Sequence, residues 1–202
     1  MEYVIVVLAA YLLGCSNMAV YLAKRNKVDL SGGSGNPGTS NATMLMGWKA
    51  GIIVGIHDIG KAVIAVILAQ ILFPHLPYVG AVAGVACVLG HVFPLFMKFR
   101  GGKGFASFVG MTLALNWKLA LVILALMVLV TLITDYLVLG TVTTVVAVPV
   151  ALGIATRSFV LALILCVATV VILVKHRENY KRIYHGTEIG LRNAAMGKYR
   201  VK

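Results

Sequence analysis

Long apolar runs alternate with short polar segments along this chain. A helix needs about 20 apolar residues to cross the hydrocarbon core of a bilayer. Six runs in this chain approach that length. A seventh, at residues 104–116, is shorter and would cross only if it were tilted, in thinned bilayer or packed against other helices. The pattern therefore predicts an all-α polytopic membrane protein with six or seven transmembrane helices. The six long runs lie at residues 3–23, 50–73, 78–97, 118–134, 136–155 and 158–174.

The distribution of positive charge favours seven helices. With seven spans and an external N-terminus, fifteen of the 18 Lys and Arg residues lie on the inner side. Only Lys118 and Arg157 lie outside, and Lys61 falls within a span. Six spans would instead place the basic residues of 98–103 and 175–202 on opposite sides. Because inner loops of membrane proteins carry the excess of Lys and Arg, we predict seven spans, an external N-terminus and a cytoplasmic C-terminus.

Composition agrees with a membrane protein. The chain is 60% apolar and 12% charged, with a mean hydropathy of +0.97. Soluble domains contain on average about 45–50% apolar and about 25% charged residues. The net charge of +12 lies between the apolar runs and lacks interleaved aromatic residues, which favours anionic membrane partners over nucleic acid. The three cysteines lie in apolar runs without a CxxC pair, so we expect no disulfide, metal or cofactor. No basic segment precedes the first run, which predicts a retained span rather than a cleaved signal.

Residues 31–41 form the first polar segment with chemical potential. Four glycines within residues 31–38 allow successive backbone N–H groups to turn toward one point, as in an anion-binding nest. The formal GxGxxG match from Gly33 to Gly38 follows a membrane span rather than a strand, so it is no dinucleotide site. Asn41 is expected to cap the following helix. A flexible polar loop is the alternative. The side-chain donors of this segment are Ser34, Asn36, Ser40 and Asn41.

A second segment surrounds Lys103 with Gly101, Gly102 and Gly104 at the start of an apolar run. A phosphate there would meet backbone N–H groups, the positive end of the helix dipole and an ammonium group. Gly104 follows the lysine where a Walker A loop needs Ser or Thr, so this is not a nucleotide loop. The alternative is an ordinary basic inner loop.

The third segment, residues 175–188, is rich in charge. If it is helical, His176, Asn179 and Arg182 share one face. The alternative is a basic tail that lies on anionic lipid.

Asp58 and Lys61 lie three residues apart inside a predicted span. Unpaired charges there are costly, so we expect the two to neutralise each other or to face a polar cavity; a structural pair and a catalytic role both stay open. We expect His57 to be packed or hydrogen-bonded. HxxxxD, GxSxG and HExxH motifs are absent, so any reaction must depend on positioning and charge stabilisation.

Together these segments resemble the bacterial acyl-phosphate:glycerol-3-phosphate acyltransferases, in order and spacing, from about residue 11 to residue 188. Asp58-Ile-Gly-Lys61 also resembles a membrane DxxK element of that family. One departure is Met44, where the family usually has an Arg; Lys49 or Arg100 must then compensate, or the activity is altered. The resembling segments are Ser34-Gly-Asn-Pro-Gly-Thr-Ser-Asn41, Gly90-His-Val-Phe-Pro94 with Gly101-Gly-Lys-Gly104, and His176-Arg-Glu-Asn179 with Gly186-Thr-Glu188.

The resemblance implies a single membrane acyltransferase domain over residues 1–188, followed by a basic cytoplasmic tail at 189–202. It implies a bacterial inner-membrane enzyme with a cytoplasmic active site that transfers the acyl chain of acyl phosphate to the 1-hydroxyl of glycerol 3-phosphate. The products would be lysophosphatidic acid and phosphate, in the first step of phospholipid synthesis and without a cofactor. Membrane lipids and the soluble enzyme that makes acyl phosphate are the implied partners.

The resemblance also assigns roles, which would bring the three segments into one pocket. Lys103, Ser34 and His176 would be catalytic, and Asp58 with Lys61 would form an intramembrane polar pair. Two other functions stay open: an anion transporter or channel, and a catalytically lapsed relative that binds acyl phosphate or lipid. The substrate-binding residues would be Asn36, Gly38, Ser40, Asn41, His91, Arg100, Gly101, Gly102, Gly104, Arg177, Asn179 and Glu188.

Overall fold

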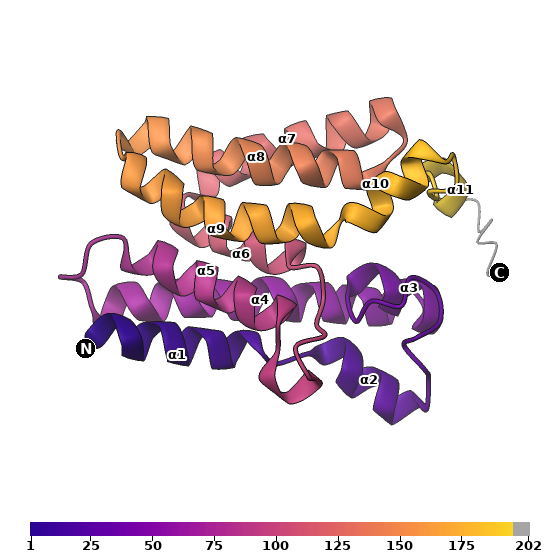
Figure 1. Cartoon of the computed structure of the whole chain (residues 1–202), viewed down its shortest axis with the longest axis horizontal. Helices are drawn as coiled ribbons and strands as arrows, with labels where there is room; N and C mark the ends of the chain where they lie inside the picture. The colour runs from indigo at the N-terminus through magenta and orange to yellow at the C-terminus, as the bar shows by residue number, and fades with distance from the viewer. Residues whose placement is uncertain (196–202) are drawn as a thin grey trace. The chain divides into compact units, whose positions relative to one another are not determined.

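The computed structural model describes residues 1–195, which form helices and connecting turns without a β-strand in that range. The described chain is therefore all-α, as predicted. It divides into two compact units, residues 1–116 and the chain from Trp117 onward. Figure 1 labels the helices of each unit.

The first unit is built around α5 (Val79–Val92), of which 12 of the 14 residues are buried. Such an apolar, enclosed helix is expected at the centre of a membrane bundle, where neighbouring helices rather than lipid cover it. The other helices of this unit are α1 (Glu2–Gly14), α2 (Met18–Asn26), α3 (Thr39–Met46), α4 (Trp48–Leu72), the 3₁₀ turn η1 (Leu95–Met97) and α6 (Phe105–Leu115).

Glycines let these helices pack closely. A Cβ atom on Gly14 would collide with the backbone of Cys87, and one on Gly90 would collide with the backbone of Tyr11. Gly110 of α6 meets the backbone of Ile59 on α4 in the same way. Small residues at helix contacts are typical of membrane proteins, where dispersion and close backbone approach replace the hydrophobic effect.

The first apolar run is interrupted. The predicted span at 3–23 is divided into α1 and α2 by Cys15, Ser16 and Asn17. The Asn17 side chain caps α2 by accepting a hydrogen bond from the N–H of Val20 at 3.1 Å. The whole stretch Glu2–Asn26 is nevertheless long and apolar enough to cross a membrane.

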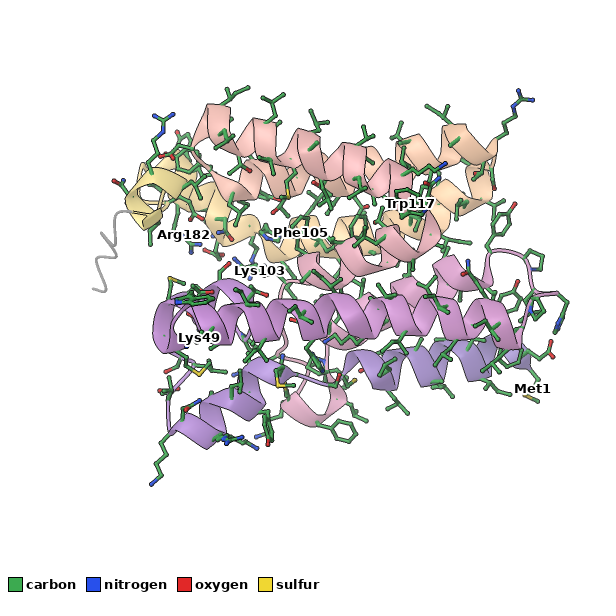
Figure 2. All side chains as sticks on the ribbon, turned by 180° about the vertical axis from the view of Figure 1, so that it is seen from behind. Met1, Lys49, Lys103, Phe105, Trp117 and Arg182 are labelled. Carbon is green, nitrogen blue, oxygen red and sulfur yellow. The ribbon has the colours of Figure 1, made fainter. Side chains whose placement is uncertain are left out.

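The two ends of the first unit carry different segments. Near the N-terminus, Glu2 pairs with His75 at 2.9 Å, and the Tyr3 hydroxyl donates to the Pro77 carbonyl at 2.6 Å. Lys49 lies at the other end of α4 from Met1 (Figure 2). The N-terminus and the turn after α4 therefore share one end, as the predicted alternation of sides requires.

The second unit contains three long helices and a folded C-terminal segment. Helices α8 and α9 are joined by a hydrogen bond from the Thr169 hydroxyl to the Val145 carbonyl, at 2.7 Å. Its helices are α7 (Trp117–Thr134), α8 (Leu137–Thr156), α9 (Phe159–Lys175), α10 (Arg177–Tyr184) and α11 (Leu191–Ala195).

Asp135, in the turn between α7 and α8, holds the start of the predicted basic tail. The N–H of Leu191 donates to its carbonyl at 2.7 Å, and the N–H of Arg192 donates to its carboxylate at 2.9 Å. The beginning of the tail is therefore folded against this turn. The remainder of the tail, residues 196–202, lies outside the described residues.

Within residues 1–195, five helical segments are long and apolar enough to span a bilayer, and a sixth is obtained if α9 and α10, bent by 46°, count as one. The short run at 104–116 forms α6, whose 11 residues fall below that length. The described part of the chain therefore has the helices of an integral membrane protein, with five or six candidate spans. The seventh span and the orientation stay predictions.

We expect Gly14→Ala to lower the free energy of unfolding by about 1–3 kcal/mol, because its Cβ would enter the backbone of Cys87. Gly60→Ala is the matched control, since no atom lies within 4 Å of the corresponding Cβ position. Thermal unfolding in one detergent would measure both variants. Equal unfolding midpoints for the two variants would contradict the close contact of α1 with α5.

Candidate active site

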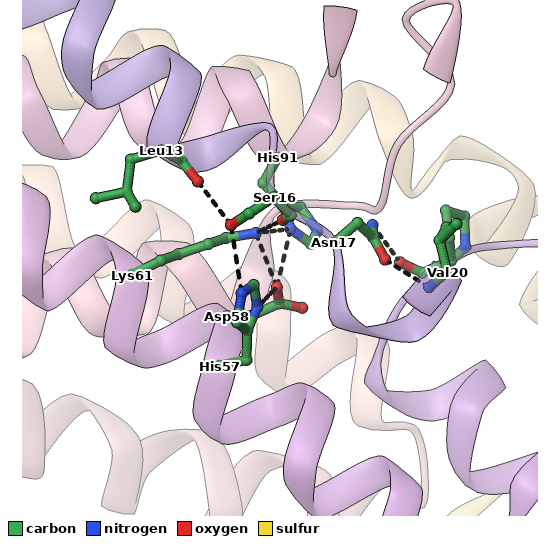
Figure 3. Close-up of polar contacts among 9 residues, drawn as sticks. Leu13, Ser16, Asn17, Val20, His57, Asp58, Lys61 and His91 are labelled. Atoms are coloured by element: carbon green, nitrogen blue, oxygen red, sulfur yellow. Dashed lines mark hydrogen bonds and ion pairs between the residues drawn. The ribbon is translucent and has the colours of Figure 1, made fainter. Parts of the chain in front are cut away.

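A buried polar network lies between α1, α4 and α5 of the first unit (Figure 3). The Lys61 ammonium and the Asp58 carboxylate are 2.8 Å apart, and each side chain is only 2% exposed. The two side chains form an ion pair within α4, which is long and apolar enough to span a membrane. Each charge alone would cost about 2.5–3.5 kcal/mol at the centre of a bilayer, so the pairing is needed for either residue to be present.

The Lys61 ammonium lies within hydrogen-bonding distance of three groups. These are the Asp58 carboxylate, the carbonyl oxygen of Ser16 at 2.7 Å and the His91 Nδ1 atom at 3.0 Å. The same Nδ1 atom lies 3.4 Å from the Asp58 carboxylate, so it accepts from Lys61 in one tautomer and donates to Asp58 in the other.

His57 completes the network as a hydrogen-bonded residue, in line with the prediction. Its Nδ1 lies 3.3 Å from the Asp58 carboxylate, and its Nε2 lies 3.3 Å from the Ser16 hydroxyl. The Ser16 hydroxyl in turn donates to the Leu13 carbonyl at 2.7 Å. The break between α1 and α2 is thus tied to α4 by side chains as well as by the Ser16 backbone.

The glycine loop that carries Lys103 packs directly on His91. The N–H of Gly102 donates to the His91 carbonyl at 3.1 Å, and the N–H of Gly101 donates to Val92 at 3.2 Å. A Cβ on Gly102 would collide with the imidazole ring. His91 is 3% exposed and lies beneath the loop. The structure therefore gives this predicted substrate-binding residue a contact through which it supports the loop.

Lys103 lies at the junction of this loop with α6, next to Phe105 in Figure 2. Gly104 is the N-cap of α6 and has φ of 90°, a left-handed conformation that favours glycine. Lys103 is half-buried, whereas Arg100 is exposed. The first N–H groups of a helix have no intrahelical acceptor, so this junction offers hydrogen-bond donors and the positive end of a dipole beside an ammonium group.

Asn41 organises the first loop rather than capping a helix, so that prediction is wrong. Helix α3 begins at Thr39, with Gly38 as its N-cap, and Asn41 lies inside it. Its side-chain oxygen accepts from the N–H of Ser34 at 2.8 Å, and its amide nitrogen donates to the Leu30 carbonyl at 3.0 Å. Buried to 1% exposure, Asn41 holds the loop closed. The apolar pattern gave no sign of so short a helix.

The remaining predicted residues of this loop differ in exposure. Ser34 and Ser40 are exposed, Asn36 is half-buried and Gly38 is buried. At the start of the loop, the hydroxyl and the N–H of Ser31 donate to Asp29 at 2.5 and 2.9 Å. These two hydrogen bonds hold the pKa of Asp29 below its usual range, so it is ionised at neutral pH.

Asn17 also supports the first loop, and sequence reasoning missed it. Its side-chain nitrogen donates to the carbonyl oxygen of Pro37 at 3.2 Å while its oxygen caps α2. The signal available in the sequence was the polar pair Ser16–Asn17 within an otherwise apolar run.

In the second unit, Glu188 joins two residues of α10. Its carboxylate accepts from the Asn179 side chain at 2.6 Å and from Arg182 Nε at 2.5 Å. The predicted shared face of Asn179 and Arg182 is confirmed by this common partner. His176 lies at the bend between α9 and α10, 7% exposed, with Nδ1 2.8 Å from the Ile172 carbonyl.

Arg177 and the possible metal ligands are the last candidate groups. Arg177 is exposed and pairs with Glu178 at 3.3 Å. Within residues 1–195, no three His, Cys, Asp or Glu side chains form a group that could hold a metal ion.

We expect Glu188→Gln to lower the free energy of unfolding by about 1 kcal/mol, because it removes the charge that Arg182 contacts on a partly exposed surface. Glu178→Gln is the control, since Glu178 pairs with Arg177 and Lys181 on a more exposed surface. Both are measured by thermal unfolding. A shift of equal size in the two variants would show that Glu188 does not hold the C-terminal segment.

The chain is similar in sequence to bacterial acyltransferases. The glycerol-3-phosphate acyltransferase of Thermoanaerobacter pseudethanolicus is 40% identical over 194 residues, covering 93% of this chain and 95% of that protein. Glycerol-3-phosphate acyltransferase 1 of Oceanobacillus iheyensis is 36% identical over 212 residues, covering 98% and 99%. The Coxiella burnetii enzyme is 38% identical over 193 residues, covering 93% and 97%.

Solved structures agree with the sequence relatives. The crystal structure of PlsY, an integral membrane glycerol 3-phosphate acyltransferase, in its glycerol 3-phosphate form has a TM-score of 0.90 at 31% identity, over 97% of this chain and 98% of that one. Its lysophosphatidic acid form gives 0.86 at 32% identity, over 94% and 95%. The sequence model of the glycerol-3-phosphate acyltransferase family matches residues 4–186, which include parts of both units. The chain therefore belongs to the glycerol-3-phosphate acyltransferase family and is a multi-pass membrane protein.

Proposed function

We propose that acyl phosphate is the donor in the acyl transfer to glycerol 3-phosphate that this family carries out. The observation that carries the proposal is the pair of loops in the first unit, each leading into a helix start, with Lys103 at one of them. Both substrates of such a reaction are anionic. Backbone N–H groups and an ammonium suit a donor whose leaving group is phosphate.

The reaction then proceeds by direct attack. The glycerol 1-hydroxyl oxygen forms a bond to the acyl carbonyl carbon, and the bond from that carbon to the phosphate oxygen breaks. The departing phosphate takes the hydroxyl proton, which balances the step without a protein base. This agrees with the lack of an HxxxxD motif in the sequence. Catalysis consists of positioning and of stabilising the developing negative charge.

Roles carried over from the family follow this chemistry. Lys103 is the main cation on the transferring group, and His176 with Asn179 holds glycerol 3-phosphate. Glu188 orders the segment that follows α10, a role supported by its contacts with Asn179 and Arg182. Asn41, which holds the loop closed through Ser34 and Leu30, keeps it in place for phosphate binding. The residues that bind phosphate oxygens in the first loop are Ser34, Asn36, Gly38 and Ser40.

The membrane arrangement is part of the proposal. The protein is a single domain over residues 1–188 with a basic tail, in a bacterial inner membrane, and α6 is the short seventh span. The N-terminus is outside, and both loops and the tail face the cytoplasm, where the soluble enzyme that makes acyl phosphate delivers it. The inward bias of Lys and Arg supports this orientation.

The donor is tested with purified protein in bicelles, by measuring lysophosphatidic acid and free phosphate while each substrate is omitted in turn. Acyl phosphate with glycerol 3-phosphate is expected to give both products in equal amounts, and acyl-CoA or acyl carrier protein thioester to give none. Product formation from a thioester at a similar rate would overturn the assignment of the donor. Flux of phosphate across vesicles without product would favour a transporter.

Lys103→Ala is expected to lower kcat at least about 100-fold, because it removes the ammonium that stabilises the transition state. Lys98→Ala is the control, a neighbouring lysine on the same loop. Steady-state phosphate release, with unfolding midpoints to confirm folding, measures both. Full activity in folded Lys103→Ala would remove this lysine from the mechanism.

Met44→Arg is expected to lower KM for one of the anionic substrates by about 10-fold, because an arginine there would add a charge-assisted hydrogen bond to phosphate. Met44 lies half-buried in α3. Met44→Leu keeps the apolar character and is the control. A KM that is unchanged for both substrates would mean that other groups already supply the missing contact.

A further inference from the structure

The first loop and the glycine loop of the first unit are connected by a series of hydrogen bonds that are joined to one another through Ser16–Asn17 and through His91. The series begins at the first loop, where the Pro37 carbonyl accepts from the Asn17 side chain at 3.2 Å. The next residue back along the chain, Ser16, presents its carbonyl to the Lys61 ammonium at 2.7 Å. Two adjacent residues of the α1–α2 break are thus bound, Asn17 to the loop and Ser16 to α4.

From Lys61 the series continues to the glycine loop. Lys61 lies 3.0 Å from Nδ1 of His91, while Asp58 compensates its charge. The backbone of His91 accepts from Gly102, and its ring occupies the space where a Cβ of Gly102 would lie. Lys103 is the next residue. Figure 3 shows the central part of this series, from Asn17 through Lys61 to His91.

We propose that Asn17, Asp58, Lys61 and His91 are positioning residues that fix the first loop and the glycine loop relative to each other. Through His91 and Gly102 they determine where Lys103 is held. This inference rests on the proposed function. A reaction without a protein base depends on exact positioning, and the four residues supply the rigidity that positioning requires. These four residues act through the loops and need not touch substrate.

Stability alone does not account for the buried charges. Replacing a buried ion pair by neutral residues of similar volume is often neutral or stabilising, whereas removing one partner costs about 3–5 kcal/mol. A buried network whose polar groups are satisfied can specify one arrangement of the chain. Specificity matters here because a displacement of about 1 Å at a catalytic group can lower the rate about 100-fold.

The double variant Asp58→Asn/Lys61→Met removes both charges together and so leaves no lone buried ion. We expect it to fold and to have kcat at least about 10-fold below that of the wild type, with faster amide exchange at residues 98–104. Wild-type kcat and wild-type exchange in the folded double variant would overturn the proposal.

Asn17→Ser provides a second test if the double variant does not fold. Serine is a good N-cap, so α2 keeps its capping hydrogen bond while the contact with Pro37 is lost. Amide exchange at residues 31–38 is expected to rise and kcat to fall about 10-fold. Asn26→Ser is the matched control, because the Asn26 side chain donates only within α2, to Leu22. Equal effects of the two substitutions would contradict the proposal.

A compensating pair tests the contact between His91 and the loop. Gly102→Ala is expected to lower kcat at least about 10-fold, because its Cβ meets the ring. His91→Asn keeps a side-chain amide, which can accept or donate, near the Nδ1 position and removes the ring atoms that clash. The pair His91→Asn/Gly102→Ala should therefore be several-fold more active than Gly102→Ala alone. Activity no higher than that of Gly102→Ala would refute the positioning contact.

These readouts separate the positioning role from the assignment of the donor. Amide exchange at 31–38 and 98–104 reports on the loops whether or not acyl phosphate is the substrate. If the wild type is inactive with acyl phosphate but the variants loosen both loops, the donor assignment fails and the positioning role stands. If the wild type is active and the folded variants leave both kcat and exchange unchanged, only the positioning role fails.

Discussion

The ion pair of Asp58 and Lys61 is the interaction on which the first unit depends. Neither charge is stable alone in an apolar bundle, so the helices around each residue must pack in a way that keeps the two charges together. The ammonium contacts the break between α1 and α2, the Asp58 side chain of α4 and the His91 side chain of α5, and so defines the relative position of these elements. The network also reaches two loops through Asn17 and His91. A single charge pair thereby links helix packing with the geometry of the candidate site.

Glycine has a second role besides flexibility in this fold. Gly102 lacks a side chain because the His91 ring fills that space, and Gly14 lacks one because the backbone of α5 does. The glycines of the Lys103 loop, read from the sequence as a cradle for phosphate, thus have a packing reason as well. The two explanations are compatible: a loop held tightly on a buried ring can present its N–H groups in one arrangement.

The proposed reaction suits such a rigid frame. Acyl phosphate, the proposed donor, carries its own good leaving group, and its phosphate can take the proton of the attacking hydroxyl. The protein then has to hold two anions in line and stabilise charge, which backbone N–H groups at helix starts and a nearby lysine can do. Hydrogen bonds from Asn179 and Arg182 to the Glu188 carboxylate give the second unit a similar local rigidity.

Local pattern alone determined much of this protein. The apolar runs matched the long helices to within a few residues, because a span must be apolar over its whole length, and two charges one turn apart in a span had to pair. Tertiary structure decided the rest: the break at Ser16–Asn17, the role of Asn41 inside α3, the position of His91 beneath the loop and the attachment of Leu191 to Asp135. Many of these contacts join residues tens of positions apart, such as Ser16 with Lys61 and Asp135 with Leu191. Such contacts depend on which backbone groups meet after the helices have packed. The spacing of apolar residues along the chain predicts single helices and does not predict which of their groups meet.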